Sequence, residues 1–352
     1  MNFSFFCTFV RVKFFRKILY PFSLIYSAIV SIRNLAYDKG ILPSKSFDFP
    51  IILVGNLNVG GTGKSPHIEY LIRLLIKKYK IAVLSRGYKR KSKGFQLADK
   101  NATVSQLGDE PMQFYKKFKD ILVAVDTDRV NGITSLRNLS NPPVIVLLDD
   151  AFQHRKVNAG LSVLLTSFDD LYVDDLVLPT GNLRETRKGA RRANIIIVTK
   201  CPSNISKEDR IEISKKLKSE KHQLIFFSTV VYGASLIGGN KELSVSELNE
   251  YKVLLVTGIA NSKPLEQYLE SLNIDFHHLK YRDHHTFSEQ DKKIMNRKLE
   301  SLTGSKKVIL TTEKDYVRSF SGGNENIYYL PIMSKIIDKE EAFNEEILNY
   351  VR

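Results

Sequence analysis

The sequence predicts an α/β protein of two α/β/α lobes, the larger built on a doubly wound parallel sheet. Its 352 residues suffice for one large domain or two ordinary ones, and 43% hydrophobic with 26% charged residues is an ordinary globular composition. Short β-branched runs alternate with helical stretches, notably 65–79 and 111–118, which is typical of a parallel sheet covered by helices. The strands expected in this sheet are residues 51–54, 81–84, 121–125, 144–148, 161–165 and 195–198.

A second series of strands follows a charged helical stretch at about 206–220 and predicts a smaller α/β domain. These strands are expected at 224–228, 253–257, 276–280 and 307–311. The chain ends in a charged helical stretch that could pack back on the core. The predicted organisation is therefore an N-terminal helix over 1–35, a core over 36–222, a smaller domain over 223–338 and a C-terminal helix over 339–352.

The first 35 residues are apolar and aromatic, and they predict an interfacial, membrane-associated helix. Four basic residues interrupt the segment between positions 11 and 17. The uncharged run 18–32 is shorter than the roughly 20 residues that a membrane-spanning helix needs, and no small-residue cleavage site follows it. Apolar side chains would enter the headgroup region while the basic residues meet anionic lipid. The alternative is a first helix buried in the protein.

The chain is strongly basic, with 53 Lys and Arg against 38 Asp and Glu and a net charge of +15. This balance suits nucleic acid, an anionic membrane surface or a phosphorylated substrate. The sequence has no tryptophan, no zinc-finger spacing and no basic-aromatic single-strand motif, so nucleic acid is not expected as a partner. Cys7 and Cys201 form no disulfide framework or metal pattern, which suits a reducing cytosol.

The stretch VGNLNVGGTGKSPH, residues 54–67, lies between a predicted strand and a predicted helix and resembles the phosphate-loop pattern G-x-x-x-x-G-K-[ST]. Asn58 replaces the first glycine, and asparagine tolerates a positive φ better than most residues. Lys64 is expected to reach the nucleotide β- and γ-phosphates and Ser65 to ligate Mg²⁺. The alternative is a glycine-rich turn without a ligand. The residues predicted to bind the nucleotide are Asn58, Val59, Gly60, Gly61, Thr62, Gly63, Lys64 and Ser65.

Two further acidic sites accompany this loop. The apolar run VIVLL ends in Asp149 and Asp150, and carboxylates at the carboxyl end of a parallel strand are placed to hold Mg²⁺. The alternative is that Asp149 and Asp150 lie in a solvated turn at the strand end and bind no metal. Asp109 lies in the stretch GDEP, at an expected helix start, where the residues alone favour a helix-capping or first-turn carboxylate.

Several motifs form an ordered series that spans nearly the whole chain after about residue 18. The series is GGTGKSP, SRGY at 85–88, GDEP at 108–111, DDAFQH at 149–154, LPTGNLRE at 178–185, VTGIANSKP at 256–264, YRDHHTF at 281–287 and TTEKDY at 311–316. These motifs resemble those of one family, the tetraacyldisaccharide 4'-kinases, commonly called LpxK, with Ala151 where the family usually has Gly and Ser65 where it usually has Thr.

The resemblance implies an activity, a fold and a location. The activity is transfer of the γ-phosphate of ATP, with Mg²⁺, to the 4'-hydroxyl of a tetraacyldisaccharide 1-phosphate, a lipid A precursor, to form lipid IVA. The implied fold has two α/β lobes, the larger like that of P-loop NTPases, and an N-terminal helix at the membrane. The expected location is the cytoplasmic face of the inner membrane, where the protein would meet anionic lipid as a monomer.

The resemblance also implies site residues. It makes Asp109 the catalytic base rather than a cap, with His284 as its partner and His285 as the competing position. Glu110 would lie near the metal, Glu185 could assist Mg²⁺ and Arg184 could hold a phosphate. It assigns no role to residues 312–315. The competing functions are a soluble P-loop kinase of a small metabolite and a nucleotide-switch ATPase.

Overall fold

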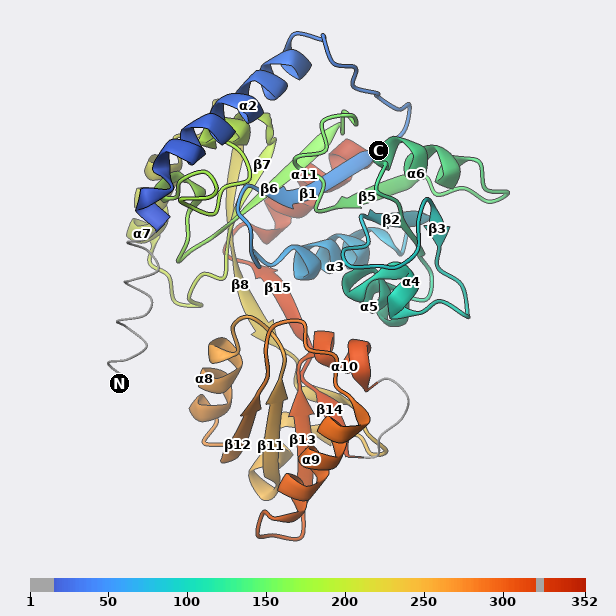
Figure 1. Ribbon diagram of the computed structural model, residues 1–352, viewed down its shortest axis with the longest axis vertical. Coiled ribbons are helices and arrows are strands. Elements are labelled where there is room, and N and C mark those ends of the chain that lie inside the picture. Colours follow the sequence, from blue (N-terminus) through green and yellow to red (C-terminus); the bar gives the residue numbers. More distant parts are fainter. Residues whose placement is uncertain (1–15, 321–325) are drawn as a thin grey trace.

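The structure is a computed structural model that describes residues 16–320 and 326–352 and shows two α/β lobes stacked along the long axis (Figure 1). The larger lobe contains a nine-stranded sheet in the order β15-β8-β7-β6-β1-β5-β2-β4-β3. The smaller lobe contains a six-stranded sheet in the order β10-β9-β14-β13-β11-β12. Both sheets are mostly parallel, so the predicted α/β class with two sheets is confirmed.

The elements of the larger lobe come from both ends of the chain. Its strands are β1 (Ile51–Asn56), β2 (Ile81–Ser85), β3 (Gln96–Leu97), β4 (Leu122–Val125), β5 (Ile145–Asp149), β6 (Leu161–Ser167), β7 (Ile195–Thr199), β8 (Leu224–Tyr232) and β15 (Ile332–Ile336). Its helices are α2 (Tyr20–Asp38), α3 (Lys64–Leu75), α4 (Val104–Leu107), α5 (Asp109–Lys117), α6 (Arg129–Arg137), α7 (Lys207–Leu217) and α11 (Glu340–Val351), with 3₁₀ turns η1 (Tyr172–Asp174) and η2 (Arg187–Arg192).

The smaller lobe is a continuous insertion between β8 and β15. Its strands are β9 (Ser235–Gly238), β10 (Leu243–Ser244), β11 (Lys252–Thr257), β12 (Phe276–Lys280), β13 (Lys307–Thr311) and β14 (Ile327–Tyr329). Its helices are α8 (Lys263–Ser271), α9 (Glu289–Glu300) and α10 (Glu313–Ser319), with the 3₁₀ turn η3 (Val245–Glu250).

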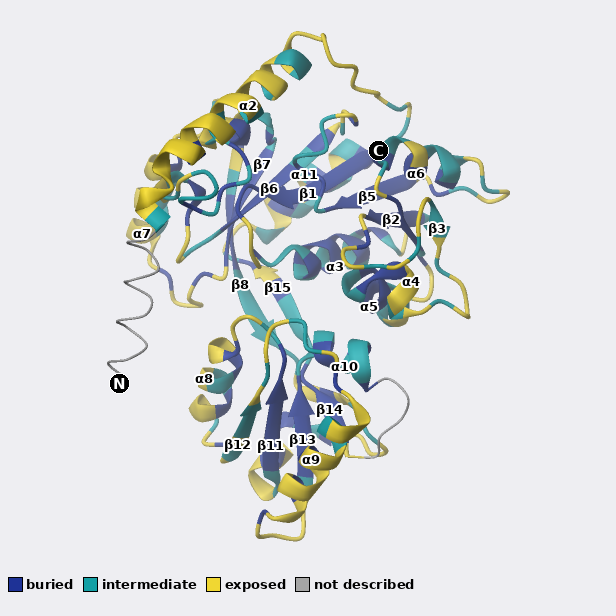
Figure 2. Cartoon of the chain, in the orientation of Figure 1, coloured by how far each residue is buried: buried dark blue, intermediate teal, exposed yellow. Residues whose placement is uncertain are grey.

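Strand β1 is the centre of the larger sheet, between β5 and β6, and its residues are buried on both faces (Figure 2). One face packs on apolar residues of α3 and α11, including Ile72 and Ile347. The other packs on α6 through Ile133 and Leu136. The C-terminal helix thus contributes to the core of the larger lobe, while Val54 of β1 pairs with Asp149 of β5 at the carboxyl edge.

The structure corrects the predicted place of residues 224–228. They were expected to open the smaller domain, but β8 pairs in parallel with β7 of the larger sheet. Residues Phe226 and Phe227 are buried in that lobe, and burying these rings stabilises the added strand. Strand β15, which was not predicted, then pairs antiparallel with β8.

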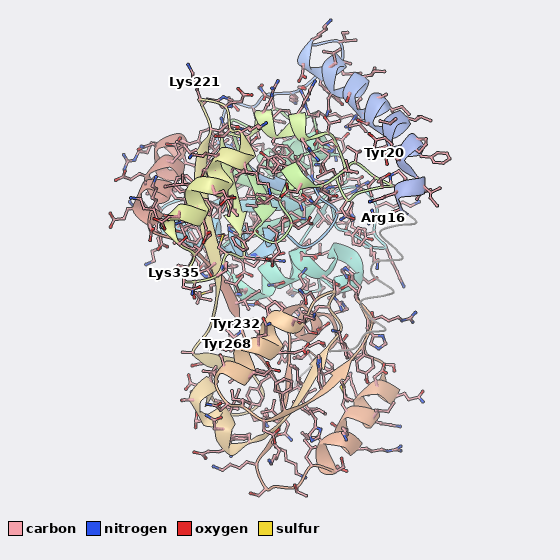
Figure 3. All side chains as sticks on the ribbon, turned by 90° about the vertical axis from the view of Figure 1, so that its left-hand side faces the viewer. Arg16, Tyr20, Lys221, Tyr232, Tyr268 and Lys335 are labelled. Carbon is pink, nitrogen blue, oxygen red and sulfur yellow. The ribbon has the colours of Figure 1, made fainter. Side chains whose placement is uncertain are left out.

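Strands β8 and β15 together reach from the larger sheet toward the smaller lobe (Figure 1). At their far end Tyr232 stacks on Tyr268 of α8, with ring centroids 4.0 Å apart (Figure 3). Two chain crossings therefore join the lobes.

Helix α2 lies along the outside of the larger lobe, with Ser23 as its buried residue (Figure 2). The alternative of a buried first helix is therefore wrong for α2. Its side chains Phe22, Ile25, Ile29 and Ile32 are each at least 60% exposed. No helix in residues 16–320 and 326–352 has the length and apolar character to cross a membrane. The predictions for residues 1–15, Cys7 among them, lie outside the described residues.

Candidate active site

The predicted phosphate loop joins β1 to α3. Its backbone takes positive φ at Gly60 (135°) and Gly63 (82°), which glycine adopts without the strain of a Cβ. Asn58 does not have a positive φ, so the reason given for its tolerance at the first glycine position is wrong. Instead Asn58 forms a β-bridge with Leu183, and its Nδ2 donates to Asp175 Oδ2 at 3.3 Å. The loop is thus supported by residues of the LPTGNLRE segment and of the turn before it.

The loop is also held from β7 and β8, by residues that the sequence did not single out. Thr199 Oγ1 donates to the carbonyl of Thr62 at 2.8 Å, and Lys200 Nζ donates to the carbonyl of Gly61. His67 Nδ1 lies 2.7 Å from the carbonyl of Gly63, and its Nε2 lies 3.0 Å from Ser228 Oγ. Burial lowers the pKa of His67 to about 4, so a neutral imidazole links the loop to β8.

A cluster of charges lies at the carboxyl ends of β1 and β5. Lys64 Nζ lies 3.3 Å from Asn56 Oδ1 and 3.6 Å from Asp150 Oδ2, and Arg184 Nη2 donates to Asp150 Oδ1 at 2.8 Å. Burial alone would raise the pKa of Asp150, but the charges of Lys64 and Arg184 outweigh it, and this pKa lies below its ordinary value. Asp150 is therefore an ionised group between two cations.

Asp149 is more deeply buried than Asp150 and accepts a hydrogen bond from Ser85 Oγ at 3.0 Å. Burial, together with the negative charge of Asp150, raises the pKa of Asp149 to about 6. Arg129, itself buried, donates from Nη2 to the Asp149 carbonyl at 3.4 Å and so helps to hold this turn.

Asp109 begins α5 in the larger lobe and is met by His284 of the smaller lobe. His284 Nδ1 lies 3.3 Å from Asp109 Oδ2. His285 points elsewhere, with its Nε2 3.1 Å from Asp291 and its ring stacked on Tyr281. The structure therefore places His284, not His285, beside Asp109. The sequence spacing could not make this choice because the two residues are adjacent.

Helix α10 brings three charged residues of the smaller lobe onto the larger lobe, and it includes the motif residues that had no assigned role. Glu313 pairs with Lys117 at 2.8 Å, and Lys314 pairs with Glu110 at 3.0 Å. Although burial would raise the pKa of Glu110, Lys314 outweighs that effect and lowers it. Arg318 pairs with Asp109 at 2.7 Å. These partners are about 200 positions apart, so no local pattern could have revealed them.

Glu185 lies in a network of nitrogen donors. Arg192 Nη2 donates to both of its oxygens at 2.9 Å, and Asn34 of α2 donates at 2.9 Å. Gln153 Nε2 donates to Glu185 at 3.0 Å and to the carbonyl of Asn56 at 2.9 Å. This network connects α2 to the end of β1, and it makes Arg192 an internal ion-pair partner of Glu185.

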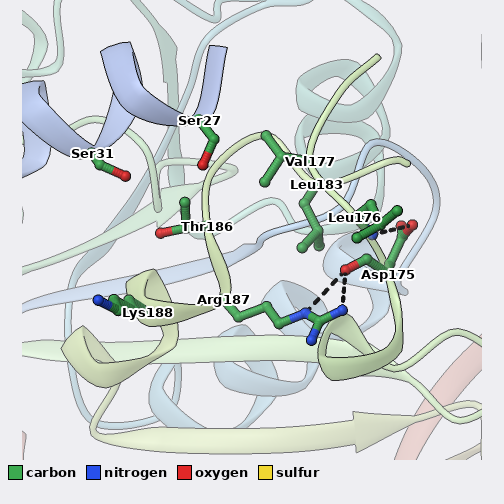
Figure 4. A pocket seen from close by; sticks show the side chains of 9 residues that line it. All are labelled: Ser27, Ser31, Asp175, Leu176, Val177, Leu183, Thr186, Arg187 and Lys188. Carbon is green, nitrogen blue, oxygen red and sulfur yellow. Dashed lines mark hydrogen bonds between the residues drawn. The ribbon is translucent and has the colours of Figure 1, made fainter. Parts of the chain in front are cut away.

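A cavity of about 390 Å³ lies between α2 and the start of η2 (Figure 4). Ser27 and Ser31 of α2 line it on one side, and Thr186, Arg187 and Lys188 line it on the other. Arg187 is held there by hydrogen bonds to the carbonyl of Asp175 at 2.8 and 3.1 Å. Tyr26 of α2 also donates to the carbonyl of Arg184 at 3.1 Å, so α2 contacts the segment that carries Arg184 beside this cavity.

The phosphate loop leads into a helix, and carboxylates at strand ends lie beside it. A carboxylate–histidine pair joins the two lobes. Together these features define a nucleotide-dependent phosphotransferase. The family model for tetraacyldisaccharide-1-P 4'-kinase, LpxK, matches residues 15–352. The chain belongs to this family, and its activity is the 4'-phosphorylation of tetraacyldisaccharide 1-phosphate in lipid A biosynthesis.

Relatives and a solved structure agree with this membership. The tetraacyldisaccharide 4'-kinase of Flavobacterium johnsoniae is 54% identical over 338 residues, which cover 96% of this chain and 97% of that protein. That of Flavobacterium psychrophilum is 50% identical over 343 residues, covering 97% and 98%. The crystal structure of LpxK from Aquifex aeolicus in complex with ATP superposes with a TM-score of 0.77 at 30% identity, covering 96% of this chain and all of that one.

Proposed function

We propose that the chain transfers the γ-phosphate of ATP to the 4'-hydroxyl of the lipid disaccharide, with Asp109 as the proton acceptor. The observation that carries this assignment is the contact between Asp109 of the larger lobe and His284 of the smaller lobe. A histidine that contacts a carboxylate can orient it and share the proton that it takes up. The Aquifex complex supports ATP as the phosphate donor.

In this proposal the nucleotide phosphates lie on the loop of residues 58–65. Its glycines let backbone N–H groups approach an anion, and the N-terminus of α3 adds partial positive charge. Lys64 would contact the β- and γ-phosphates. Arg184 would turn from Asp150 to a phosphate oxygen, since a guanidinium binds phosphate with two parallel hydrogen bonds.

The donor set suits Mg²⁺. Ser65, Asp149, Asp150 and Glu110 offer hard oxygen atoms, and the described residues contain no cluster of three or more His, Cys, Asp or Glu for an all-protein metal cage. This fits an ion that is usually held by one or two carboxylates together with substrate phosphates. When bound, Mg²⁺ supplies charge neutralisation on the β- and γ-phosphates. Glu185 fits least well, because Arg192 already occupies both of its oxygens.

We further propose that the two sheets mark two lobes and that their approach assembles the site. Asp109, Lys64 and Asp150 belong to the larger lobe, whereas His284 belongs to the smaller one. The chain crosses between the lobes twice, in β8 and β15, which is the arrangement expected for hinge closure.

The test is a transfer assay with γ-labelled ATP and tetraacyldisaccharide 1-phosphate in detergent micelles, with Mg²⁺ or with EDTA. We expect label in the lipid with Mg²⁺ and very little with EDTA. Label found only in free phosphate would instead support a nucleotide-switch ATPase. Equal transfer in EDTA would remove the metal from the proposal.

We also propose that the exposed apolar side of α2 binds the cytoplasmic face of the inner membrane. Phe22, Ile25, Ile29 and Ile32 recur at helical spacing, while polar residues of α2 bond the larger lobe, as Ser23 does with Thr180 at 2.7 Å. The net charge of +15 favours an anionic surface.

The membrane proposal is tested by flotation with vesicles that contain phosphatidylglycerol. Ile25→Asp and Ile29→Asp should each weaken vesicle binding about tenfold or more, because each removes an apolar side chain from the interface and adds a like charge. Ile294→Asp, an exposed position on α9, is the matched control and should bind as the wild type does. Unchanged flotation of both α2 variants would refute the orientation.

A further inference from the structure

Arg318 of α10 is an arginine of the smaller lobe whose side chain is only 5% exposed. Its Nε donates to Asp109 Oδ2 at 2.8 Å, and its Nη2 lies 2.7 Å from the same oxygen in an ion pair. Its Nη1 lies 3.0 Å from Asp315 Oδ1 and 3.0 Å from the carbonyl of His285. The guanidinium thus lies between the proposed proton acceptor and the core of the smaller lobe, and two carboxylates share its charge.

The partner that holds Arg318 is fixed in turn. Asp315 is completely buried, and its Oδ2 accepts hydrogen bonds from the Gly258 N–H at 2.9 Å and from Thr312 Oγ1 at 2.7 Å. The carbonyl of the same Gly258 accepts the backbone N–H of His284 at 3.0 Å. A Cβ at Gly258 would lie 3.1 Å from Asp315 Oδ1, so the packing here is close. One peptide turn therefore positions both Arg318 and His284.

Both side chains converge on the same atom of the larger lobe. Arg318 and His284 contact Oδ2 of Asp109, and within the described residues the hydrogen bonds to this carboxylate involve Oδ2 and not Oδ1. A carboxylate held through one oxygen presents the other to the acceptor. His284 alone, at 3.3 Å, is a long contact, whereas the two Arg318 contacts have the lengths typical of charge-assisted hydrogen bonds.

The other ion pairs between the lobes, unlike the pair of Arg318 with Asp109, do not involve the proposed proton acceptor. Lys117 with Glu313 and Lys314 with Glu110 join the lobes without touching Asp109. They can account for docking of α10 on α5 but not for the orientation of the proton acceptor. Arg318 can account for both.

We infer that Arg318 is a positioning residue for phosphoryl transfer, which orients the Asp109 carboxylate so that Oδ1 faces the acceptor hydroxyl when the lobes are together. This inference rests on the proposed role of Asp109 as proton acceptor. Misplacing a reacting group by about 1 Å can cost about 10²-fold in rate without loss of substrate binding. The residue acts through Asp109 and does not itself need to contact the substrate.

The experiment compares Arg318→Ala, Arg318→Lys and the wild type in the label-transfer assay. For Arg318→Ala we expect kcat to fall about 10²-fold while KM for ATP and for the lipid changes about twofold or less. Added guanidinium chloride at a non-denaturing concentration should restore part of kcat in Arg318→Ala. Sodium chloride at equal ionic strength is the control and should not restore it. Arg297→Ala, an exposed arginine of α9, should keep wild-type kcat and show no response to guanidinium.

Folding is controlled separately, because the alanine variant leaves Asp315 buried with one cation fewer. Arg318→Lys keeps the charge but lacks the planar fork, so it should fold with the wild-type melting temperature and still have a reduced kcat. Wild-type kcat in Arg318→Lys and Arg318→Ala would overturn the inference. The inference would also be overturned if guanidinium did not restore kcat and if the loss in kcat of each variant matched its loss in melting temperature. Activity retained by Asp109→Asn would refute the proton acceptor instead, which keeps the two failures distinct.

Discussion

Replacing Asp109 by asparagine should lower kcat for label transfer to the lipid about 10²–10⁴-fold, the range that a positioned general base contributes. Asparagine has nearly the same shape and can still accept hydrogen bonds from Arg318 and His284, so the contact between the lobes should persist. It cannot take up the proton of the acceptor hydroxyl. We therefore expect the loss in kcat and little change in KM for ATP.

The matched control for this variant is Asp120→Asn, because Asp120 is an exposed aspartate of the same lobe. It should transfer label at the wild-type rate. If Asp109→Asn retained more than about a tenth of wild-type kcat, the loss in kcat would be smaller than the smallest contribution expected of a general base. Asp109 would then be a helix-start carboxylate, and another group would accept the proton.

Replacing Lys64 by alanine should lower kcat about 10²–10³-fold, the cost of removing one positioned group that stabilises transition-state charge. The ammonium lies where the phosphate loop meets Asp150, and its side chain is only 18% exposed, so bulk solvent would not replace it well. Asp150 keeps Arg184 as a partner in the variant, and the fold should be retained. The increase in melting temperature on adding ATP should also shrink, which measures nucleotide binding without catalysis.

Lys77→Ala is the control, since Lys77 follows the same helix and is exposed. Both readouts should match the wild type. A Lys64→Ala protein with normal transfer and normal stabilisation by ATP would show that the loop does not hold the nucleotide phosphates. The proposed nucleotide site at residues 58–65 would then be refuted.

The features that could be predicted from the sequence are those that short segments encode. The strand expected at 51–54, the glycines at 60 and 63 and the helix expected from residue 65 follow from local propensity and turn geometry. The structure contains all of them, with the strand at Ile51–Asn56 and the helix beginning at Lys64. The run that ends in Asp149 and Asp150 is likewise a buried strand followed by a turn. The order of the motifs then identified the family, which the comparisons confirm.

Contacts between segments far apart in the chain could not be predicted in this way. Whether residues 224–228 join the larger or the smaller sheet depends on which strand edge is free, and a strand pattern does not carry that information. The same limit applies to Glu185, whose partners Asn34 and Gln153 lie on α2 and in the DDAFQH turn. Their proximity results from the packing of helices on the sheet.

Helix α10 shows most clearly which features local sequence specifies and which depend on long-range packing. Thr312 and Asp315 form a capping pattern that marks a helix start, and Thr312 Oγ1 does accept the N–H of Asp315 at 3.3 Å. That local signal says nothing about what the helix meets. The pairing of Arg318 with Asp109 and of Lys314 with Glu110 arises because β8 and β15 carry the smaller lobe against α5. Local chemistry therefore specified the loop and the helix starts, while long-range packing brought the groups of the site together.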